Sequence, residues 1–469
     1  MTTPQPKIVI VGAGPSGLLT AHYLRLNGYR DVTLLEKLGR VGGLACSITY
    51  KGRSFDLGAN YITPAYKEIR KLARQLGATT YAERPFIAMK LPEQPGERAK
   101  LGSIVTAMRI RKDGSKIPFL SFAWSNLRYI WKRFKLRSVL DTPTFAGIER
   151  HPEMTVPMNQ WLIDNRLENL HGVFLLPVNL MGFGTVATTP AMYALKFMTL
   201  KSYIPMLIKE APLIGRIARW PRRFTEGFQR LFDRLSWHHD VRFDIDIEQV
   251  RRSKDGVQIT FREPEQILDE IRMVRRELHA DKIILACPLT EDVMSKFMDI
   301  DPESQEGKLL DKITSLSYCM TSRHVTGPAF DGRDPLAACY PLPEIGFLPW
   351  GVAKQWHDSS FTQFYSRVEP KLPYDDVEEK VQKGVDEMIE MMGGKSEAPD
   401  AAWRTFNRFP YFQHVDAEAI NAGWFTKLEN QQGVNHTHYV GGATNFELIE
   451  PIAEYAKNMV ATHFPKRKS

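Results

Sequence analysis

"IVIVGAGPSGLLTAHYLRLNGYRDVTLLEKLGRVGG", from Ile8 to Gly43, contains two groups of glycines separated by a helical and an extended pattern. The apolar, β-branched run Lys7–Val11 is typical of a strand buried on both faces. Three glycines at GxGxxG spacing follow, and the pattern predicts a helix over Leu18–Asn27 and a second strand over Val32–Leu35. Together with the acid after the second strand, this order predicts a βαβ unit that binds a dinucleotide; the alternative is an ordinary glycine turn.

Each glycine of the first group has its own expected role. Gly12 permits the tight turn, Gly14 lets the backbone approach a pyrophosphate, and Gly17 lets the helix pack close to the strand. The helix N terminus supplies N–H donors and the positive end of the helix dipole. Glu36, at the end of the second strand, is placed to accept hydrogen bonds from an adenosine ribose, and its charge would repel a 2′-phosphate.

The residues after Glu36 favour FAD over NAD. Arg40 can pair with a pyrophosphate, and the following glycine pair lets the backbone pass close to a cofactor. The stretch "FDLGANYI", Phe55–Ile62, has small residues that suit a chain lying against a flat ring. The cofactor-binding candidates of these segments are Gly12, Gly14, Pro15, Ser16, Gly17, Glu36, Lys37, Arg40, Gly42, Gly43, Gly58, Ala59 and Asn60.

These motifs together resemble the two-dinucleotide-binding-domain flavoproteins, in the branch of amine oxidases, phytoene desaturases and protoporphyrinogen oxidase. Four later segments are similar to the same branch: Arg219–Leu235, Val241–Phe261, Ala280–Pro288 and His438–Phe464. The resemblance implies FAD as cofactor and an α/β fold, with a Rossmann-type FAD-binding domain, a mixed α+β substrate domain and a helical insertion. We expect the FAD-binding domain at 1–80, 220–290 and 400–469, the substrate-binding domain at 81–219 and 291–399, and the insertion at about 118–140.

The resemblance also implies roles for residues near the C terminus. The backbone at Val250 is expected to meet the adenine, and the turn Gly441–Gly442 to lie near the ribityl chain and flavin ring. Glu450 and Ile452 are further cofactor-binding candidates. Gly442 stands where the family usually has an acid. No cysteine follows Cys339, so the cysteinyl attachment of some amine oxidases is excluded and non-covalent FAD is expected.

Within this branch the chain is most similar to bacterial polyunsaturated fatty acid isomerases, which make conjugated linoleic acid. The similar segments are "RVGGLACSITYKGRSFDLGA", Thr155–Met198, Tyr411–Gly442 and the tail "EPIAEYAKNMVATHF". The resemblance implies a long apolar, acidic substrate. It is loose between Ala82 and Arg150, where Arg84 is the candidate for that family's carboxylate-binding arginine.

A stretch without Asp, Glu, Lys or Arg, Asn169–Leu195, is expected to line an apolar substrate pocket, and plain core is the alternative. Its prolines and glycines argue against a membrane span. The pocket candidates are Arg84, Phe174, Met181, Phe183, Tyr193 and Tyr411.

The chemistry is expected to rest on the cofactor, because the sequence has no Ser-His-Asp order, no HExxH motif and no metal-ligand cluster. We therefore predict an FAD-dependent oxidoreductase or isomerase that transfers a hydride to flavin N5, with double-bond isomerisation of an unsaturated fatty acid preferred. One alternative is a flavin-dependent amine oxidase, dehydrogenase or desaturase, and another is a non-catalytic FAD-binding redox protein. His436 and His438, which alternate on a predicted strand, are interpreted as structural or surface residues.

The formal net charge of +8 suits an acidic ligand or an anionic membrane surface, and no nucleic-acid recognition motif is present. The insertion Pro118–Leu140 has five basic residues, no acid and aromatic residues at helical intervals. This pattern predicts a peripheral membrane helix, or alternatively a helix packed on the substrate domain.

Four cysteines without CxxC spacing argue against a disulfide scaffold or zinc site. No signal peptide precedes the first strand, so we expect a cytoplasmic location.

Overall fold

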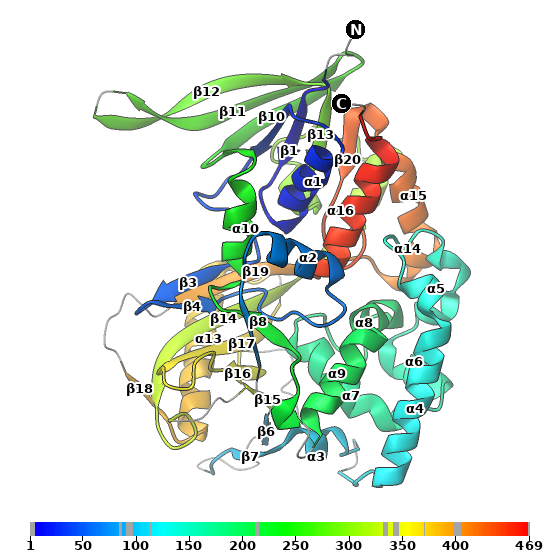
Figure 1. Cartoon of the computed structure of the whole chain (residues 1–469), viewed down its shortest axis with the longest axis vertical. Helices are drawn as coiled ribbons and strands as arrows, with labels where there is room; N and C mark the ends of the chain where they lie inside the picture. Colours follow the sequence, from blue (N-terminus) through cyan, green and yellow to red (C-terminus); the bar gives the residue numbers. More distant parts are fainter. Residues whose placement is uncertain are drawn as a thin grey trace.

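A parallel five-stranded sheet forms one end of the molecule (Figure 1). The computed structural model describes residues 5–83, 87–90, 97–111, 114–211, 215–267, 269–331, 336–340, 347–369, 371–397 and 405–467. The strand order is β20 (Thr437–Tyr439), β13 (Lys282–Leu285), β1 (Ile8–Val11), β2 (Val32–Leu35) and β9 (Asp240–Arg242). β1 and β2 are buried along their whole length, as their apolar sequences predict for a covered parallel sheet. Where one domain ends and the next begins stays a prediction.

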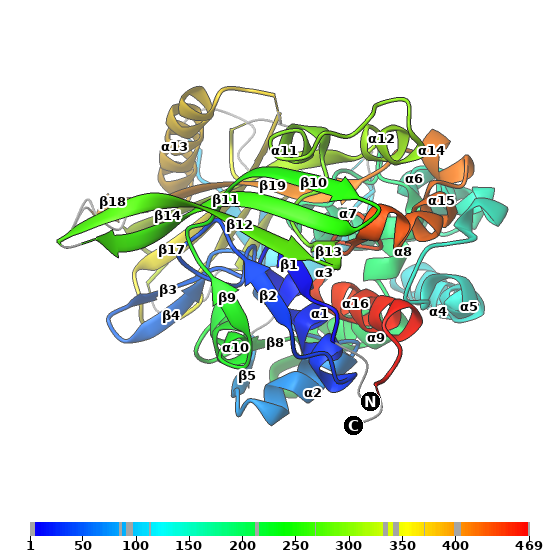
Figure 2. The same cartoon turned by 90° about the horizontal axis from the view of Figure 1, so that it is seen from above.

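Two helices from opposite ends of the chain lie side by side next to this sheet, α1 (Pro15–Leu26) and α16 (Ile449–His463) (Figures 1 and 2). α1 begins at Pro15 and not at Leu18 as predicted, because proline fits the first helical turn, where its missing N–H costs nothing. Its other end agrees with the prediction, since Gly28 follows in a left-handed conformation.

An antiparallel sheet of β10 (Asp246–Ser253), β11 (Gly256–Ile267) and β12 (Glu270–Ala280) extends from the parallel sheet (Figure 1). The turn at Asp255–Gly256 joins the first two strands. The sequence does not predict β12, because most of its side chains are exposed and five of its eleven residues are charged.

The largest sheet lies in the other half of the molecule. Its order is β18 (Lys395–Glu397), β14 (Thr314–Thr326), β17 (Phe361–Val368), β16 (Gly351–Ala353), β15 (Leu336–Tyr340), β6 (Ile87–Lys90) and β7 (Lys100–Ser103), and β19 (Thr405–His414) also pairs with β14. α13 (Tyr374–Met391) packs its buried face against this sheet. Two short ribbons, β3 (Ser47–Tyr50) with β4 (Arg53–Asp56) and β5 (Thr80–Ala82) with β8 (Arg222–Phe224), lie between the two halves.

A layer of helices completes this half (Figure 1). The helices are α3 (Ile104–Met108), α4 (Phe119–Lys135), α5 (Arg137–Leu140), α6 (Met158–Asp164), α7 (His171–Leu180), α8 (Ala191–Phe197) and α9 (Leu200–Glu210). The uncharged stretch Asn169–Leu195 forms α7, most of α8 and the turn between them, and it is largely buried, as expected. Among the described helices, none has the length and apolar character needed to cross a membrane.

The smaller helices fill the seams between these layers. They are α2 (Lys67–Gln75), α10 (Phe228–Ser236), α11 (Glu291–Met294), α12 (Gln305–Leu310), α14 (Ala417–Asn421) and α15 (Trp424–Gln431).

The prediction that His436 and His438 alternate on one strand is wrong. His436 ends a 3₁₀ turn, Val434–His436, with a φ of 60°, and only His438 lies on β20. The two histidines therefore do not share a strand face.

Candidate flavin site and substrate pocket

The first glycine turn closes tightly on the end of β1. Gly12 adopts a φ of 101°, which favours glycine, and its N–H donates to the carbonyl of Leu35 at 2.8 Å. A Cβ atom at Gly17 would lie 2.0 Å from the carbonyl oxygen of Gly12. The start of α1 can therefore approach the strand only because position 17 has no side chain.

Three glycine turns meet at the N terminus of α1. A Cβ atom at Gly43 would lie 3.1 Å from Cα of Gly14, so the second glycine group lies directly against the first. A Cβ atom at Gly14 would meet nothing nearer than Gly43 at 3.8 Å, and one at Gly441 would meet only the Ser16 hydroxyl at 3.9 Å. Bare backbone from three parts of the chain thus borders one space, which fits a cofactor with a pyrophosphate.

Two charged residues predicted to hold the cofactor are bonded to this backbone. The buried Glu36 accepts from the N–H of Ala13 at 2.7 Å through Oε2 and from the N–H of Leu38 at 2.9 Å through Oε1. Arg40 donates from Nη1 to the carbonyl of Gly43 at 3.1 Å. Both side chains therefore fasten the glycine turns, and their direct contacts with ribose and pyrophosphate stay predictions. The side chain of Lys37 is exposed.

The segment after β4 runs against the second glycine turn. A Cβ atom at Gly58 would lie 1.9 Å from the carbonyl oxygen of Leu44, and the N–H of Ala59 donates to the same oxygen at 3.1 Å. Asp56, fully buried just before this segment, accepts from the N–H of Phe228 at 2.7 Å at the start of α10. Burial raises the pKa of Asp56 to about 6. Asn60 is half-buried.

The last glycine turn carries a buried acid that the sequence analysis missed. Gly442 occupies the position at which the resemblance described above usually implies an acid, and the side chain of Glu447 packs 2.9 Å from where a Cβ of Gly442 would lie. Glu447 accepts from the N–H of Gln413 at 2.6 Å. Burial raises the pKa of Glu447 to about 7. Its sequence signal is weak: a single acid follows the uncharged residues Gly441–Phe446, and Glu450 comes three positions later.

The remaining cofactor candidates are placed as follows. Glu450 accepts from the N–H groups of Glu68 at 2.7 Å and Ile69 at 3.0 Å, so both of its oxygens cap the N terminus of α2. Burial raises the pKa of Glu450 to about 7. Ile452 is buried in the core that also contacts Ala59. Val250 is buried on β10, and its N–H donates to the carbonyl of Phe297 at 2.7 Å.

Three of the predicted pocket residues come together in one aromatic cluster. The Phe183 ring lies 5.6 Å from Tyr411 and 4.7 Å from Phe446, measured between ring centroids. Tyr193 lies 5.1 Å from Phe412 and 6.1 Å from Phe446. Phe446 belongs to the last glycine turn, so this cluster connects the helical layer with the predicted flavin region. We call Phe183, Tyr193, Tyr411, Phe412 and Phe446 the aromatic cluster.

The other pocket candidates lie apart from the aromatic cluster or outside the described residues. Phe174 packs against Tyr129 and Tyr203, with centroids 5.2 and 6.4 Å away, beneath α4. Met181 is half-buried at the end of α7. Arg84 lies outside the described residues.

A buried arginine beside these elements was not found from the sequence. Arg223 on β8 lies opposite Tyr81 on β5 and is only 1% exposed. Its Nε pairs with the carboxylate of Glu83, and its Nη2 donates to the Tyr61 hydroxyl at 2.7 Å. Within the described part of the chain nothing accepts from its buried Nη1. Tyr61 directly follows the Gly58–Asn60 segment, so Arg223 lies near the predicted flavin region.

Residues 15–318 match the family described as flavin containing amine oxidoreductase. The chain belongs to this family. Its cofactor is accordingly FAD, its fold is the FAD-binding fold of this family with a substrate domain, and the protein is an FAD-dependent oxidoreductase or isomerase. That the pyrophosphate of FAD lies where the three glycine turns meet at α1 stays a prediction. That FAD is held without a covalent bond stays a prediction.

Individual relatives of the chain carry the names of different activities. A polyenoic fatty acid isomerase of Ptilota filicina is 25% identical over 198 residues, 40% of this chain and 39% of the isomerase. A putrescine oxidase of Kocuria rosea is 40% identical over 80 residues, 17% of this chain and 16% of the oxidase. Each match spans less than two thirds of the relative.

Solved structures resemble the whole chain. The crystal structure of a CLA-producing fatty acid isomerase from P. acnes superposes with a TM-score of 0.75 at 21% identity, covering 99% of this chain and 100% of that chain. At this level of identity the likeness shows the fold alone.

Proposed function

We propose that this enzyme isomerises double bonds of an unsaturated fatty acid and that Arg223 binds the substrate carboxylate. The observation that carries the proposal is the buried Nη1 of Arg223, for which no acceptor exists among the described residues. A buried donor without an acceptor costs about 1–3 kcal/mol, which a bound acceptor would recover. A carboxylate supplies such acceptors, whereas an ammonium group has only donors.

The aromatic cluster supports an apolar substrate chain. Phe183 and Tyr411 bring aromatic surface from the helical layer and from β19 to the last glycine turn. Such surface excludes water and holds a hydrocarbon chain by dispersion and desolvation, without fixed polar groups that would need partners. The names of the relatives from Ptilota filicina and P. acnes agree with a fatty-acid substrate.

The reaction class follows from what the chain offers. When bound, FAD supplies a hydride acceptor that can also return the hydride. The residues of the chain then need to fix the position of a carbon–hydrogen bond and keep water and other acceptors out, which position and packing alone can achieve. No proton-transfer residue is assigned to the proposed reaction.

One reaction tests the reaction class. Linoleate deuterated at the bis-allylic carbon is incubated anaerobically with the holoenzyme and no external acceptor. The proposal expects conjugated product that retains deuterium at another carbon of the same molecule. Turnover that requires oxygen or an acceptor, with loss of the label from the lipid, would contradict isomerisation.

The role of Arg223 is tested by comparing free linoleate with its methyl ester, first in the wild type. R223Q should raise KM for the acid by roughly tenfold or more, because a charge-assisted hydrogen bond of about 1.5–3 kcal/mol is lost, and should change KM for the ester little. R222Q is the matched control, since Arg222 on the same strand bonds the Thr80 hydroxyl instead. If R223Q does not retain FAD, the same KM comparison is made with R223K and with the wild type alone. Equal KM values for linoleate and its methyl ester in the wild type would contradict the role of Arg223.

Amine oxidation is the second candidate, and one observation favours it. The rings of Tyr318 and Tyr411 have centroids 5.9 Å apart, and a Cβ at Gly182 would lie 2.9 and 3.0 Å from them. Electron-rich faces of such a pair can bind an ammonium group. Anaerobic bleaching of the flavin absorbance by putrescine, with no bleaching or product from linoleate, would favour this function.

A further inference from the structure

α4 has a second apolar face that points away from the core. The exposed residues recur at intervals of four, three, four and three positions, which places them on one side of the helix: Leu120, Trp124, Leu127, Trp131 and Phe134. Leu120 is 81% exposed, Trp124 68% and Trp131 56%. We call these five residues the α4 face. Both views place α4 at the outer edge of the helical layer (Figures 1 and 2).

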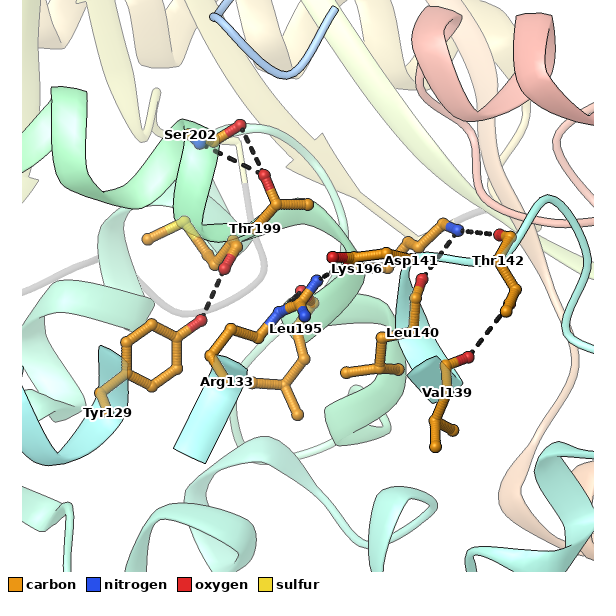
Figure 3. A network of polar contacts seen from close by, with 11 residues as sticks. Tyr129, Arg133, Val139, Leu140, Asp141, Thr142, Leu195, Lys196, Thr199 and Ser202 are labelled. Atoms are coloured by element: carbon orange, nitrogen blue, oxygen red, sulfur yellow. Dashed lines mark hydrogen bonds and ion pairs between the residues drawn. The ribbon is translucent and has the colours of Figure 1, made fainter. Parts of the chain in front are cut away.

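The opposite side of α4 is fixed in the core by a polar network (Figure 3). The Tyr129 hydroxyl donates to the carbonyl of Met198 at 2.6 Å. Arg133, with no exposed surface, donates from Nε to the carbonyl of Leu195 at 3.1 Å and pairs with Asp141. The basic insertion predicts that Arg133 is a surface charge, but Arg133 is buried. Since this inner side already packs, the α4 face is a surplus apolar surface.

Basic groups lie directly on the exposed aromatic rings. Nζ of Lys135 is 3.6 Å from the centroid of Trp131, and the guanidinium carbon of Arg137 is 4.0 Å from that of Phe134. The sequence has no Asp or Glu from Gly114 to Leu140. Two cations therefore lie against aromatic rings of the α4 face, and the run from Gly114 to Leu140 brings no carboxylate to it.

Neighbouring elements add further exposed apolar side chains. Ile204 and Ile208 are exposed on α9, which packs against α4. On α6, Ile163 is exposed close to the α4 charges, since the following Asn165 accepts from Nζ of Lys132 at 2.7 Å. Two exposed acids belong to neighbouring elements: Asp164 to α6, and Glu168 to the 3₁₀ turn Glu168–Leu170, which packs against α4.

We propose that the α4 face docks the enzyme on the surface of an anionic lipid bilayer. Tryptophans and leucines would enter the boundary between headgroups and acyl chains, while Lys135 and Arg137 reach lipid phosphates. Each basic residue near such a surface is attracted to it, and salt weakens the attraction. A second copy of this chain fits less well, because a two-fold contact would set basic residues of one copy against those of the other.

Docking at this place also suits an apolar substrate. The inner side of α4 contacts Phe174 through Tyr129, so the helix lies between the lipid surface and the aromatic interior. The membrane inference is independent of the reaction, and it holds for any ligand drawn from a bilayer. Binding to vesicles tests it without any substrate.

The experiment measures co-sedimentation of the FAD-loaded protein with vesicles of equal parts phosphatidylglycerol and phosphatidylcholine. We expect binding that weakens as salt is raised, and that W124S/W131S lowers by about tenfold or more. Tryptophan fluorescence of the bound wild type should shift to the blue. W237S is the matched control, because Trp237 is 67% exposed at the end of α10 on another part of the molecule, and it should bind like the wild type.

Three outcomes would overturn the proposal. They are absence of vesicle binding by the wild type, equal binding by wild type and W124S/W131S, and equal loss of binding in W237S. Sedimentation velocity without lipid tests whether a second copy of the chain covers the α4 face instead. A wild-type dimer that W124S/W131S converts to a monomer would assign the α4 face to such a dimer contact. Because the substituted residues are exposed, each variant should keep its fold and its FAD. The flavin absorbance of each variant checks this.

Discussion

The glycine turns around α1 and the aromatic cluster both join distant parts of the chain. The glycine turns do so through backbone contacts, and the aromatic cluster through side-chain contacts. In the glycine turns, backbone meets backbone: Gly17 approaches Gly12, and Gly43 approaches Gly14. In the aromatic cluster, rings of Phe183, Tyr193 and Phe446 meet each other. The first region therefore depends on side chains being absent, and the second on their size and shape. The two regions should respond differently to substitution.

Gly17→Ala should have the largest effect. Its new Cβ would overlap the carbonyl oxygen of Gly12, a backbone atom that cannot move away without separating α1 from β1. Overpacking typically costs about 1–3 kcal/mol where side chains can shift, and more where backbone has to move. Here the backbone of the predicted cofactor site itself has to move, so both stability and FAD binding are lost. We expect little soluble protein and almost no bound FAD, measured by yield and by the absorbance ratio at 450 and 280 nm.

Gly102→Ala provides the control for that substitution. A Cβ at Gly102 would meet nothing within 4 Å, so yield and flavin content should stay at the wild-type level. If G17A retained full FAD and wild-type stability, the close approach at α1 would not be a requirement of the site. The distinction between the two regions would then fail.

Phe183→Ala should have the next largest effect, through lost packing. Phe183 is buried among four other rings, and truncation of a buried phenylalanine typically costs about 3–5 kcal/mol of unfolding free energy. Phe183→Leu keeps most of the volume and should cost less than half as much. FAD content should remain high in both variants, because the glycine turns are untouched; chemical denaturation of the holoprotein measures the difference. Equal losses for Ala and Leu would show that the cluster is not governed by volume.

The sequence predicted the glycine region more fully than the aromatic one for a physical reason. The roles of Gly12, Gly14 and Gly17 depend on neighbours within one βαβ unit, so spacing along the chain carries the information. The grouping of Phe183 with Phe446 depends on how the helical layer packs on the last turn, which no local pattern encodes. Composition predicted that apolar residues gather there, but it could not separate Phe174 from the cluster.

Charged residues were the hardest to place from sequence. Glu450 was predicted to meet the cofactor, and its side chain caps α2, a helix far from it in the chain. Arg133 lies in a basic run that suggested the surface, yet Asp141 and a helix-end carbonyl hold it inside. Arg223 gave no signal, because its partner Glu83 comes from a distant strand end. Long-range pairing determines each of these positions.

Glu447 lies where the two regions meet, and its titration gives the smallest of the expected effects. The carboxyl group packs on Gly442 and accepts from the N–H of Gln413, next to Phe412 of the aromatic cluster. Burial raises its pKa from 4.5 to about 7, so between these values the folded protein holds a proton that the unfolded chain has lost. This contribution to stability is complete below pH 4.5 and is lost as the pH rises through 7, at up to about 1.4 kcal/mol per pH unit. E447Q should flatten the fall in unfolding free energy between pH 5 and 7 without abolishing it, because Asp56 and Glu450 titrate in the same direction.

Urea unfolding of the holoprotein at several pH values measures this fall. E418Q, which removes an exposed carboxylate on α14, is the control and should follow the wild type. Parallel curves for wild type and E447Q would show that the boundary between the two regions admits water, and that the aromatic cluster does not seal the last glycine turn.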